Sequence, residues 1–102
     1  MRYLLVLQFH SEEIEDFDEL VALEGLLIDR LPPRSKVDGH DSGRGEFNIF
    51  VFTDEPIESF RDIEKTIQHH FPSRIFKAAY RAIEQDAYII LSPPDLKDFS
   101  IG

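Results

Sequence analysis

The polar residues whose types and spacing could support chemistry gather in one stretch of the chain, at positions 38–48. This stretch reads Asp-Gly-His-Asp-Ser-Gly-Arg-Gly-Glu-Phe-Asn. Its histidine could act as a base near neutral pH. Its carboxylate and amide oxygens are the ligand types that hard divalent cations prefer. The candidate ligand-binding residues are therefore Asp38, Gly39, His40, Asp41, Glu46 and Asn48.

The turn within this stretch decides which of these side chains meet. We expect a two- or four-residue turn centred on Gly43 and Arg44, because glycines on either side of the arginine permit positive φ. Such a turn gives the cross-strand pairs Asp41–Glu46 and Gly39–Asn48, on the same face as Phe50 and Phe52. Asp38 and His40 then lie on the opposite face. A glycine within a strand either relieves crowding or lets a ligand approach the backbone.

Two carboxylates that face each other across a hairpin repel unless something offsets them. A divalent cation could bind Asp41, Glu46 and Asn48. A raised carboxyl pKa could serve acid–base catalysis, with His40 and Glu46 as the catalytic residues. Arg44 and solvent could also screen an exposed turn, which is the simplest interpretation. We expect no metal and no cofactor, because no tight metal-ligand or nucleotide-binding motif is present.

The composition narrows the function classes further. The chain has 102 residues, of which 42% are hydrophobic and 30% are charged, which is typical of one compact domain. It has no cysteine, so disulfides, thiol catalysis and cysteine-ligated zinc are excluded. Its formal net charge of −9 repels phosphate backbones and anionic lipid, so neither nucleic acid nor a membrane is an expected partner. Because the short apolar start lacks a cleavage site, we expect a cytoplasmic location.

Apolar periodicity and proline positions predict seven secondary-structure elements. Asp16 with Glu19 resembles a capping box that opens the first helix, which Pro32 and Pro33 end. Asp54-Glu55-Pro56 opens the second helix and Pro72 ends it. Strands are predicted at 2–9, 35–41, 46–53, 75–83 and 88–92.

This order predicts an α+β fold, best explained by a ferredoxin-like split βαβ sandwich with the order βαββαββ. Its two helices cover one face of an antiparallel-rich sheet. The strands at 2–9 and 46–53, which are apolar on both faces, would be central, and the weak strand at 35–41 would be an edge. An α+β sheet with another strand order is the rival. We expect one domain at 1–92 and a C-terminal tail at 93–102.

Two helices on one face leave an apolar sheet face to be covered. The residues expected at this interface are Phe50, Phe52, Leu96 and Phe99. Either a second copy, another protein or a ligand covers the face, or the C-terminal tail folds back over it. We therefore expect a non-enzymatic interaction or regulatory module, homodimeric through this face. The alternatives are a small enzyme or metal- or ligand-binding protein using His40, Asp41, Glu46 and Asn48, and a small-ligand sensor using Gly39 and Asn48.

The segment at 37–56, VDGHDSGRGEFNIFVFTDEP, resembles a segment of a group of small, mostly uncharacterised bacterial proteins. The shared pattern comprises Asp38, Gly39, His40, Asp41, Gly43, Gly45, Glu46, Asn48, Thr53 and Asp54. The resemblance implies a bacterial origin and brings no activity with it. The general outline is also similar to ferredoxin-like folds, which include dimeric α/β-barrel proteins and small-ligand regulatory modules. Such a similarity of outline does not fix a function.

Overall fold

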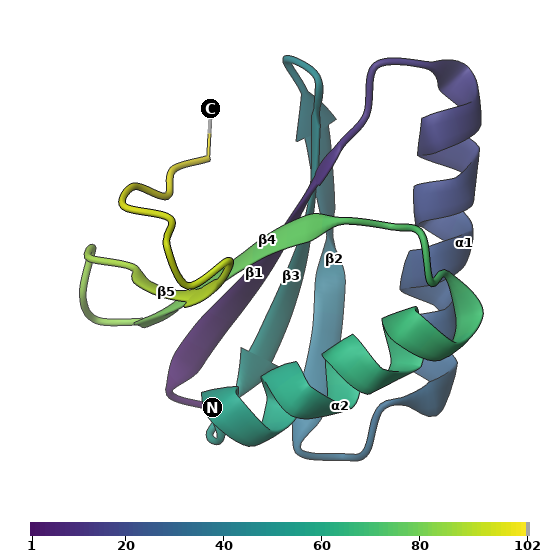
Figure 1. The fold of residues 1–102 in the computed structure, drawn as a ribbon. Coiled ribbons are helices and arrows are strands. Elements are labelled where there is room, and N and C mark those ends of the chain that lie inside the picture. The colour runs from purple at the N-terminus through teal and green to yellow at the C-terminus, as the bar shows by residue number, and fades with distance from the viewer. Residues whose placement is uncertain (102) are drawn as a thin grey trace.

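The computed structural model describes residues 1–101, and its elements follow the expected order (Figure 1). They are β1 (Tyr3–His10), α1 (Ile14–Arg30), β2 (Ser35–Gly43), β3 (Glu46–Thr53), α2 (Pro56–His70), β4 (Phe76–Ala82) and β5 (Ile89–Ser92). The expected α+β class is therefore confirmed. Neither α1 nor α2, the helices found in the described part of the chain, combines the length and apolar character that crossing a membrane requires.

The five strands form one sheet in the order β2-β3-β1-β4-β5, and every neighbouring pair is antiparallel. Strand β1 is central, and all its residues from Leu4 to Phe9 are buried. This burial agrees with its nearly continuous apolar sequence, because a strand covered on both faces needs no polar alternation. Strand β2 lies at one edge, as its low apolar content predicted.

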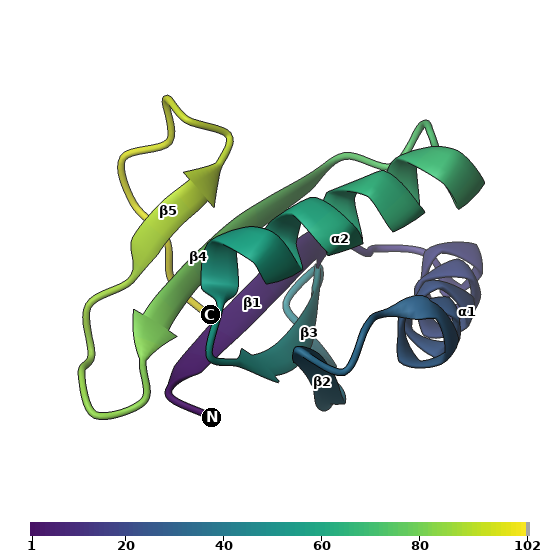
Figure 2. The same ribbon diagram turned by 90° about the horizontal axis from the view of Figure 1, so that it is seen from below.

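Both helices pack against the same face of the sheet (Figure 2). From this face β1 contributes Leu5, Leu7 and Phe9, and β3 contributes Phe47, Ile49 and Val51. The helices and β4 complete the core with Leu20, Leu23, Leu27, Ile63, Ile67 and Ala78. Successive strand residues point to opposite faces, so the intervening residues of β1 and β3 form a second, helix-free face.

The first turn of α1 corrects the predicted cap. The N-cap residue is Glu13, whose backbone N–H donates to Asp16 Oδ2 over 3.4 Å. Asp16 therefore occupies the third position of the helix and is the reciprocal partner in the capping box, not its first residue. Four acids stand close together here, at Glu12, Glu13, Glu15 and Asp16, and each favours a helix N-terminus, so the sequence left the starting residue ambiguous.

Candidate functional site

The β2–β3 hairpin turns at Arg44 and Gly45, which have φ values of 54° and 78°. Gly43 therefore pairs with Glu46, and Asp41 pairs with Asn48. The expected pairs Asp41–Glu46 and Gly39–Asn48 are wrong, because the turn lies one residue further along the chain. A two-residue turn with positive φ at both central positions suits the twist of a hairpin, and Gly45 supplies one of those positions without strain.

A β-bulge interrupts the edge strand β2 between Val37 and Gly39. Val37 pairs with Val51, whereas Gly39 already pairs with Phe50, so Asp38 is the additional residue. Gly39 has a φ of 155°, a backbone conformation that other residues rarely adopt. Its role in the fold is therefore conformational. Beyond the bulge the alternation of side chains is re-phased, and His40 lies opposite Ile49 on the helix side of the sheet.

His40 forms a specific contact with the first helix. Its Nδ1 lies 2.8 Å from Oε1 of Glu24 in α1. Its ring stacks on Phe47 with a centroid distance of 4.6 Å and an interplanar angle of 18°, and the edge of Phe17 approaches to 6.0 Å. Only 31% of the His40 side chain and 11% of the Glu24 side chain are exposed. Because a carboxylate only accepts hydrogen bonds, Nδ1 of His40 is the donor in this contact.

Glu24 is the residue of this pair that sequence reasoning did not assign to a site. It interrupts the apolar stripe of α1, and a carboxylate in such a stripe is the signal that could have identified it. Its second oxygen, Oε2, is buried and has no hydrogen-bond partner among the described residues. The pair joins the edge strand to the helix.

The six predicted ligand-binding residues do not form one cluster. His40 lies on the helix side, whereas Asp41, Glu46 and Asn48 belong to the other face, and Asp38 sits at the bulge. A catalytic pair of His40 and Glu46 would require side chains from both faces of the sheet. Within residues 1–101, no group of three or more histidine, aspartate or glutamate side chains is arranged to hold a metal ion.

A polar row crosses one end of the helix-free face. It runs over four neighbouring strands through Asp41, Asn48, Gln8 and Lys77, which are successive cross-strand partners. Gln8 and Asn48 are only 6% and 2% exposed. Gln8 Nε2 donates to the backbone carbonyl of Ser100 over 2.9 Å, whereas Asn48 Oδ1 is buried without a partner among the described residues. Beside this row, a hollow of about 230 Å³ is lined by Gln8, Phe9, His10, Gly45, Glu46 and Lys77.

The C-terminal segment therefore contacts the helix-free face, on the side of the sheet away from the helices (Figure 1). Phe99 packs against Tyr88, with ring centroids 5.1 Å apart, and Leu96 and Phe99 are both half-buried. Of the four expected interface residues, these two belong to the segment that contacts the face. The other two, Phe50 and Phe52, belong to the face itself and are also half-buried.

The opposite end of the helix-free face is apolar and open. A hollow of about 370 Å³ there is lined by Met1, Lys36, Phe52 and Ile83, and we call it the Phe52 hollow. Met1 is 52% exposed and Ile83 is 44% exposed. Large apolar side chains that share one surface hollow are typical of an interface or a ligand site.

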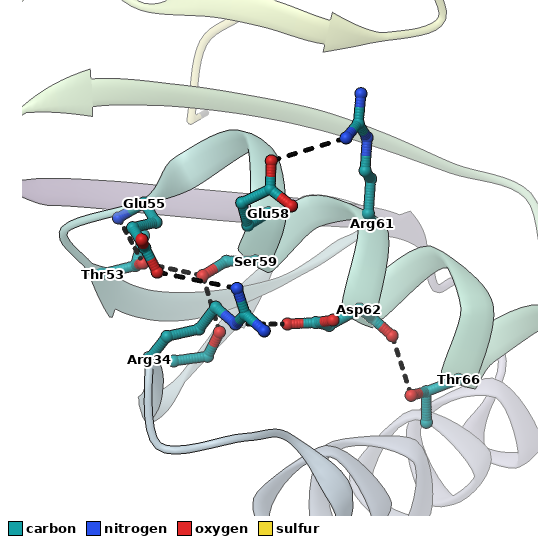
Figure 3. Close-up of polar contacts among 9 residues, drawn as sticks. Arg34, Thr53, Glu55, Glu58, Ser59, Arg61, Asp62 and Thr66 are labelled. Atoms are coloured by element: carbon teal, nitrogen blue, oxygen red, sulfur yellow. Dashed lines mark hydrogen bonds and ion pairs between the residues drawn. The ribbon is translucent and has the colours of Figure 1, made fainter.

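Two polar clusters elsewhere stabilise the scaffold. Buried Ser59 in α2 shares its hydroxyl with Thr53 and Ser35, at 2.7 Å from each Oγ, and Arg34 lies 3.1 Å from Asp62 (Figure 3). These contacts join the start of β2, the end of β3 and the first turns of α2. They fix the elements that carry the helix-free face.

The second cluster joins the loop after α2 to the start of α1. Arg74 donates to Asp16 Oδ1 and Glu19 Oε1, each over 2.9 Å. The hydrogen bond from Arg74 and that from the Glu13 backbone lower the pKa of Asp16 below its ordinary value. Burial of the Arg74 guanidinium opposes its charge, yet the two carboxylates raise its pKa overall.

Comparison with protein-family models, with curated proteins and with solved structures gives no match to this chain. Its function must therefore be argued from its own residues.

Proposed function

We propose that this chain is a non-enzymatic protein-interaction module that forms a homodimer through the open end of its helix-free face. The observation that carries this proposal is the Phe52 hollow. Both helices pack on the other face, and the C-terminal segment bonds to Gln8 and packs its Phe99 ring on Tyr88, neither of which lines the hollow. Half-buried Phe52 and exposed Met1 and Ile83 are thus left together on one surface.

Burial of apolar area is the main favourable contribution to association in the proposed dimer. Burying about 400 Å² of apolar surface contributes on the order of 10 kcal/mol before the costs of association are subtracted. Aromatic side chains near the centre of a patch commonly carry much of the binding energy. Phe52 supplies the aromatic ring of the hollow from β3, which lies between β2 and β1 in the sheet. In a twofold-symmetric dimer the same face of each copy forms the interface, so no complementary surface is needed elsewhere on the molecule.

The strand order supports a ferredoxin-like architecture as part of this proposal. β1 lies between β3 and β4, β2 lies outside β3, and all pairings are antiparallel. We propose that two interleaved split βαβ units account for this arrangement, with β5 as one more strand. In such an architecture the helix-free face is available for packing of sheet against sheet.

Charge gives the proposed dimer a salt dependence. Two copies that each carry a formal charge of −9 repel one another at long range. Salt screens this repulsion with a Debye length of about 10 Å at 0.1 M. Dimerisation through an apolar patch should therefore strengthen as the salt concentration rises, whereas a dimer held by ion pairs should weaken.

Light scattering after size exclusion, over a range of protein and salt concentrations, tests the proposal. Ile83→Asp places a charge in the Phe52 hollow, and we expect it to give a monomer. Ile28→Asp is the matched control, because Ile28 is 60% exposed on the outer side of α1. We expect this variant to remain dimeric. A wild-type chain that stays monomeric at high concentration and high salt would overturn the proposal, as would equal effects of the two substitutions.

A further inference from the structure

We infer that the neighbouring amides of Gln8 and Asn48 form a binding site for the backbone of an extended peptide segment. The chain's own C-terminal segment, residues 96–101, occupies this site incompletely. The inference rests on the proposed function in that it names a second kind of partner for the same sheet face. It concerns the opposite end of that face from the Phe52 hollow.

The two amides are placed on rigid elements. Gln8 of β1 and Asn48 of β3 are direct cross-strand partners at the centre of the sheet. The next cross-strand pair on the same face is apolar, since Val6 pairs with Phe50 two positions away along each strand. Two amide side chains that are 94% or more buried in such surroundings need hydrogen-bond partners. Gln8 has a partner, and Asn48 has an oxygen without one among the residues that the structure describes.

The hydrogen-bonding groups of the pair match those of a peptide unit. A peptide unit offers one carbonyl acceptor and one N–H donor. Gln8 Nε2 already donates to the carbonyl of Ser100, over 2.9 Å. Asn48 Oδ1 is an acceptor without a partner among residues 1–101. The site thus presents a donor and an acceptor side by side, and the segment now bound satisfies only the donor.

The incomplete match makes the C-terminal segment replaceable. A buried acceptor that lacks a partner weakens the bound state, and one satisfied hydrogen bond is worth roughly tenfold in affinity. A partner segment that supplies an N–H to Asn48 as well as a carbonyl to Gln8 therefore competes with the chain's own segment. Such competition makes the C-terminal segment an internal inhibitor of this site.

A ring contact adds side-chain selectivity to the backbone recognition. Phe99 directly precedes Ser100 and packs on Tyr88 at 5.1 Å, while the Arg81 guanidinium lies 5.9 Å from the centre of the Tyr88 ring. Arg81 is itself held by hydrogen bonds to the carbonyls of Ala82, Ile83 and Gln85. The preferred partner is therefore an extended segment with an aromatic residue just before the residue whose carbonyl Gln8 binds.

A synthetic peptide with the sequence of residues 95–102, DLKDFSIG, labelled at its N-terminus, is the probe. Its binding is measured by fluorescence anisotropy. The wild-type chain should bind it weakly, because the tethered segment competes at a high effective concentration. Phe99→Ala in the chain weakens the tethered segment, and we expect this variant to bind the probe about tenfold more tightly or better. Phe99→Leu serves the same purpose if the alanine variant does not fold.

Substitution at the amide pair tests the site itself. Adding Gln8→Leu to the Phe99 variant should reduce probe binding about tenfold, whereas adding Gln68→Leu should not change it. Gln68 is an exposed glutamine on α2 and is the matched control. A probe whose phenylalanine is replaced by alanine should bind much less. Failure of the Phe99 variants to bind the probe overturns the inference, and so does binding that Gln8→Leu leaves unchanged.

These results are separable from the test of the homodimer. The monomeric variant Ile83→Asp should still permit probe binding when combined with a Phe99 substitution, because Ile83 lines the other hollow. A dimer without probe binding refutes the peptide site alone. A monomeric wild type with probe binding refutes the dimer alone.

Discussion

The contact between His40 and Glu24 makes a quantitative prediction about stability. His40→Ala removes the hydrogen bond from Nδ1 to Glu24 Oε1, which spans 2.8 Å, and the stacking on Phe47. It leaves a largely buried carboxylate whose other oxygen already has no partner among the described residues. The unpaired carboxylate should destabilise the fold by more than the loss of the packing contacts does. Its desolvation is then no longer compensated by a hydrogen bond.

Two contributions make up the expected loss of stability in the His40→Ala variant. A hydrogen bond to a charged group contributes about 1.5–3 kcal/mol, and we take the lower part of this range because 31% of the His40 side chain is exposed. The ring stacking contributes about 0.5–1.5 kcal/mol. His40→Ala should therefore destabilise the fold by about 2–3 kcal/mol. For a chain of this length, each kcal/mol lowers Tm by about 4–8 °C.

A double-mutant cycle, measured by urea unfolding, separates the two contributions. Glu24→Leu removes the carboxylate and fills its place with an apolar side chain, which should be nearly neutral. In that background His40→Ala should lose only the stacking, about 1 kcal/mol. The coupling free energy between the two positions should thus be about 1–2 kcal/mol. If His40→Ala costs the same with and without Glu24, the carboxylate does not depend on the histidine and the reasoning fails.

Two further stability predictions concern the scaffold. The Arg74 hydrogen bond lowers the pKa of Asp16 from its ordinary 3.8. The ionised carboxylate therefore stabilises the fold at any pH above its pKa in the unfolded chain. This stabilisation is lost as the pH falls through the lower pKa of the folded protein. Asp16→Asn should lower Tm at neutral pH, and the difference from wild type should shrink in strong acid; a pH-independent difference in thermal melts would contradict this linkage. Ser59→Ala removes the hydroxyl that Thr53 and Ser35 share, and should cost about 1–3 kcal/mol in urea unfolding because Thr53 is fully buried. Unchanged stability would show that water replaces this hydroxyl.

The element order was predictable because strong local signals coincide with the real boundaries. The strand at 46–53 was predicted with the same ends that the structure gives β3. Its alternating bulky residues lie between a glycine turn and the Asp-Glu-Pro start of a helix, so both limits are marked. The start of α1 was placed too late because several acids compete for the cap. Nothing local in a run of acids selects one of them.

The arrangement of the polar residues was harder to predict. Pairing within the hairpin depends on which two residues form the turn, and the run Gly43-Arg44-Gly45 offers two choices of adjacent residues. The bulge at Asp38 adds a residue to β2, and a single inserted residue exchanges the faces of all that follow. The partner of His40 could not be predicted from the sequence for a different reason. Glu24 lies sixteen residues earlier on another element, and only the packing of α1 over the hairpin brings the two together.

The edges of the sheet favour association through the helix-free face over extension of the sheet. Strand β2 has a free outer edge, yet it carries a bulge and the exposed charged residues Lys36, Asp38 and Asp41. Strand β5, at the other edge, has four residues, and two prolines follow it. Bulges, charges, short length and proline all oppose pairing with another strand. On the helix-free face, exposed Met1 and Ile83 and half-buried Phe52 line one hollow, and the polar end of the same face already holds the chain's own C-terminal segment. The two proposals therefore assign different modes of recognition to one face, side-chain packing at one end and backbone hydrogen bonding at the other.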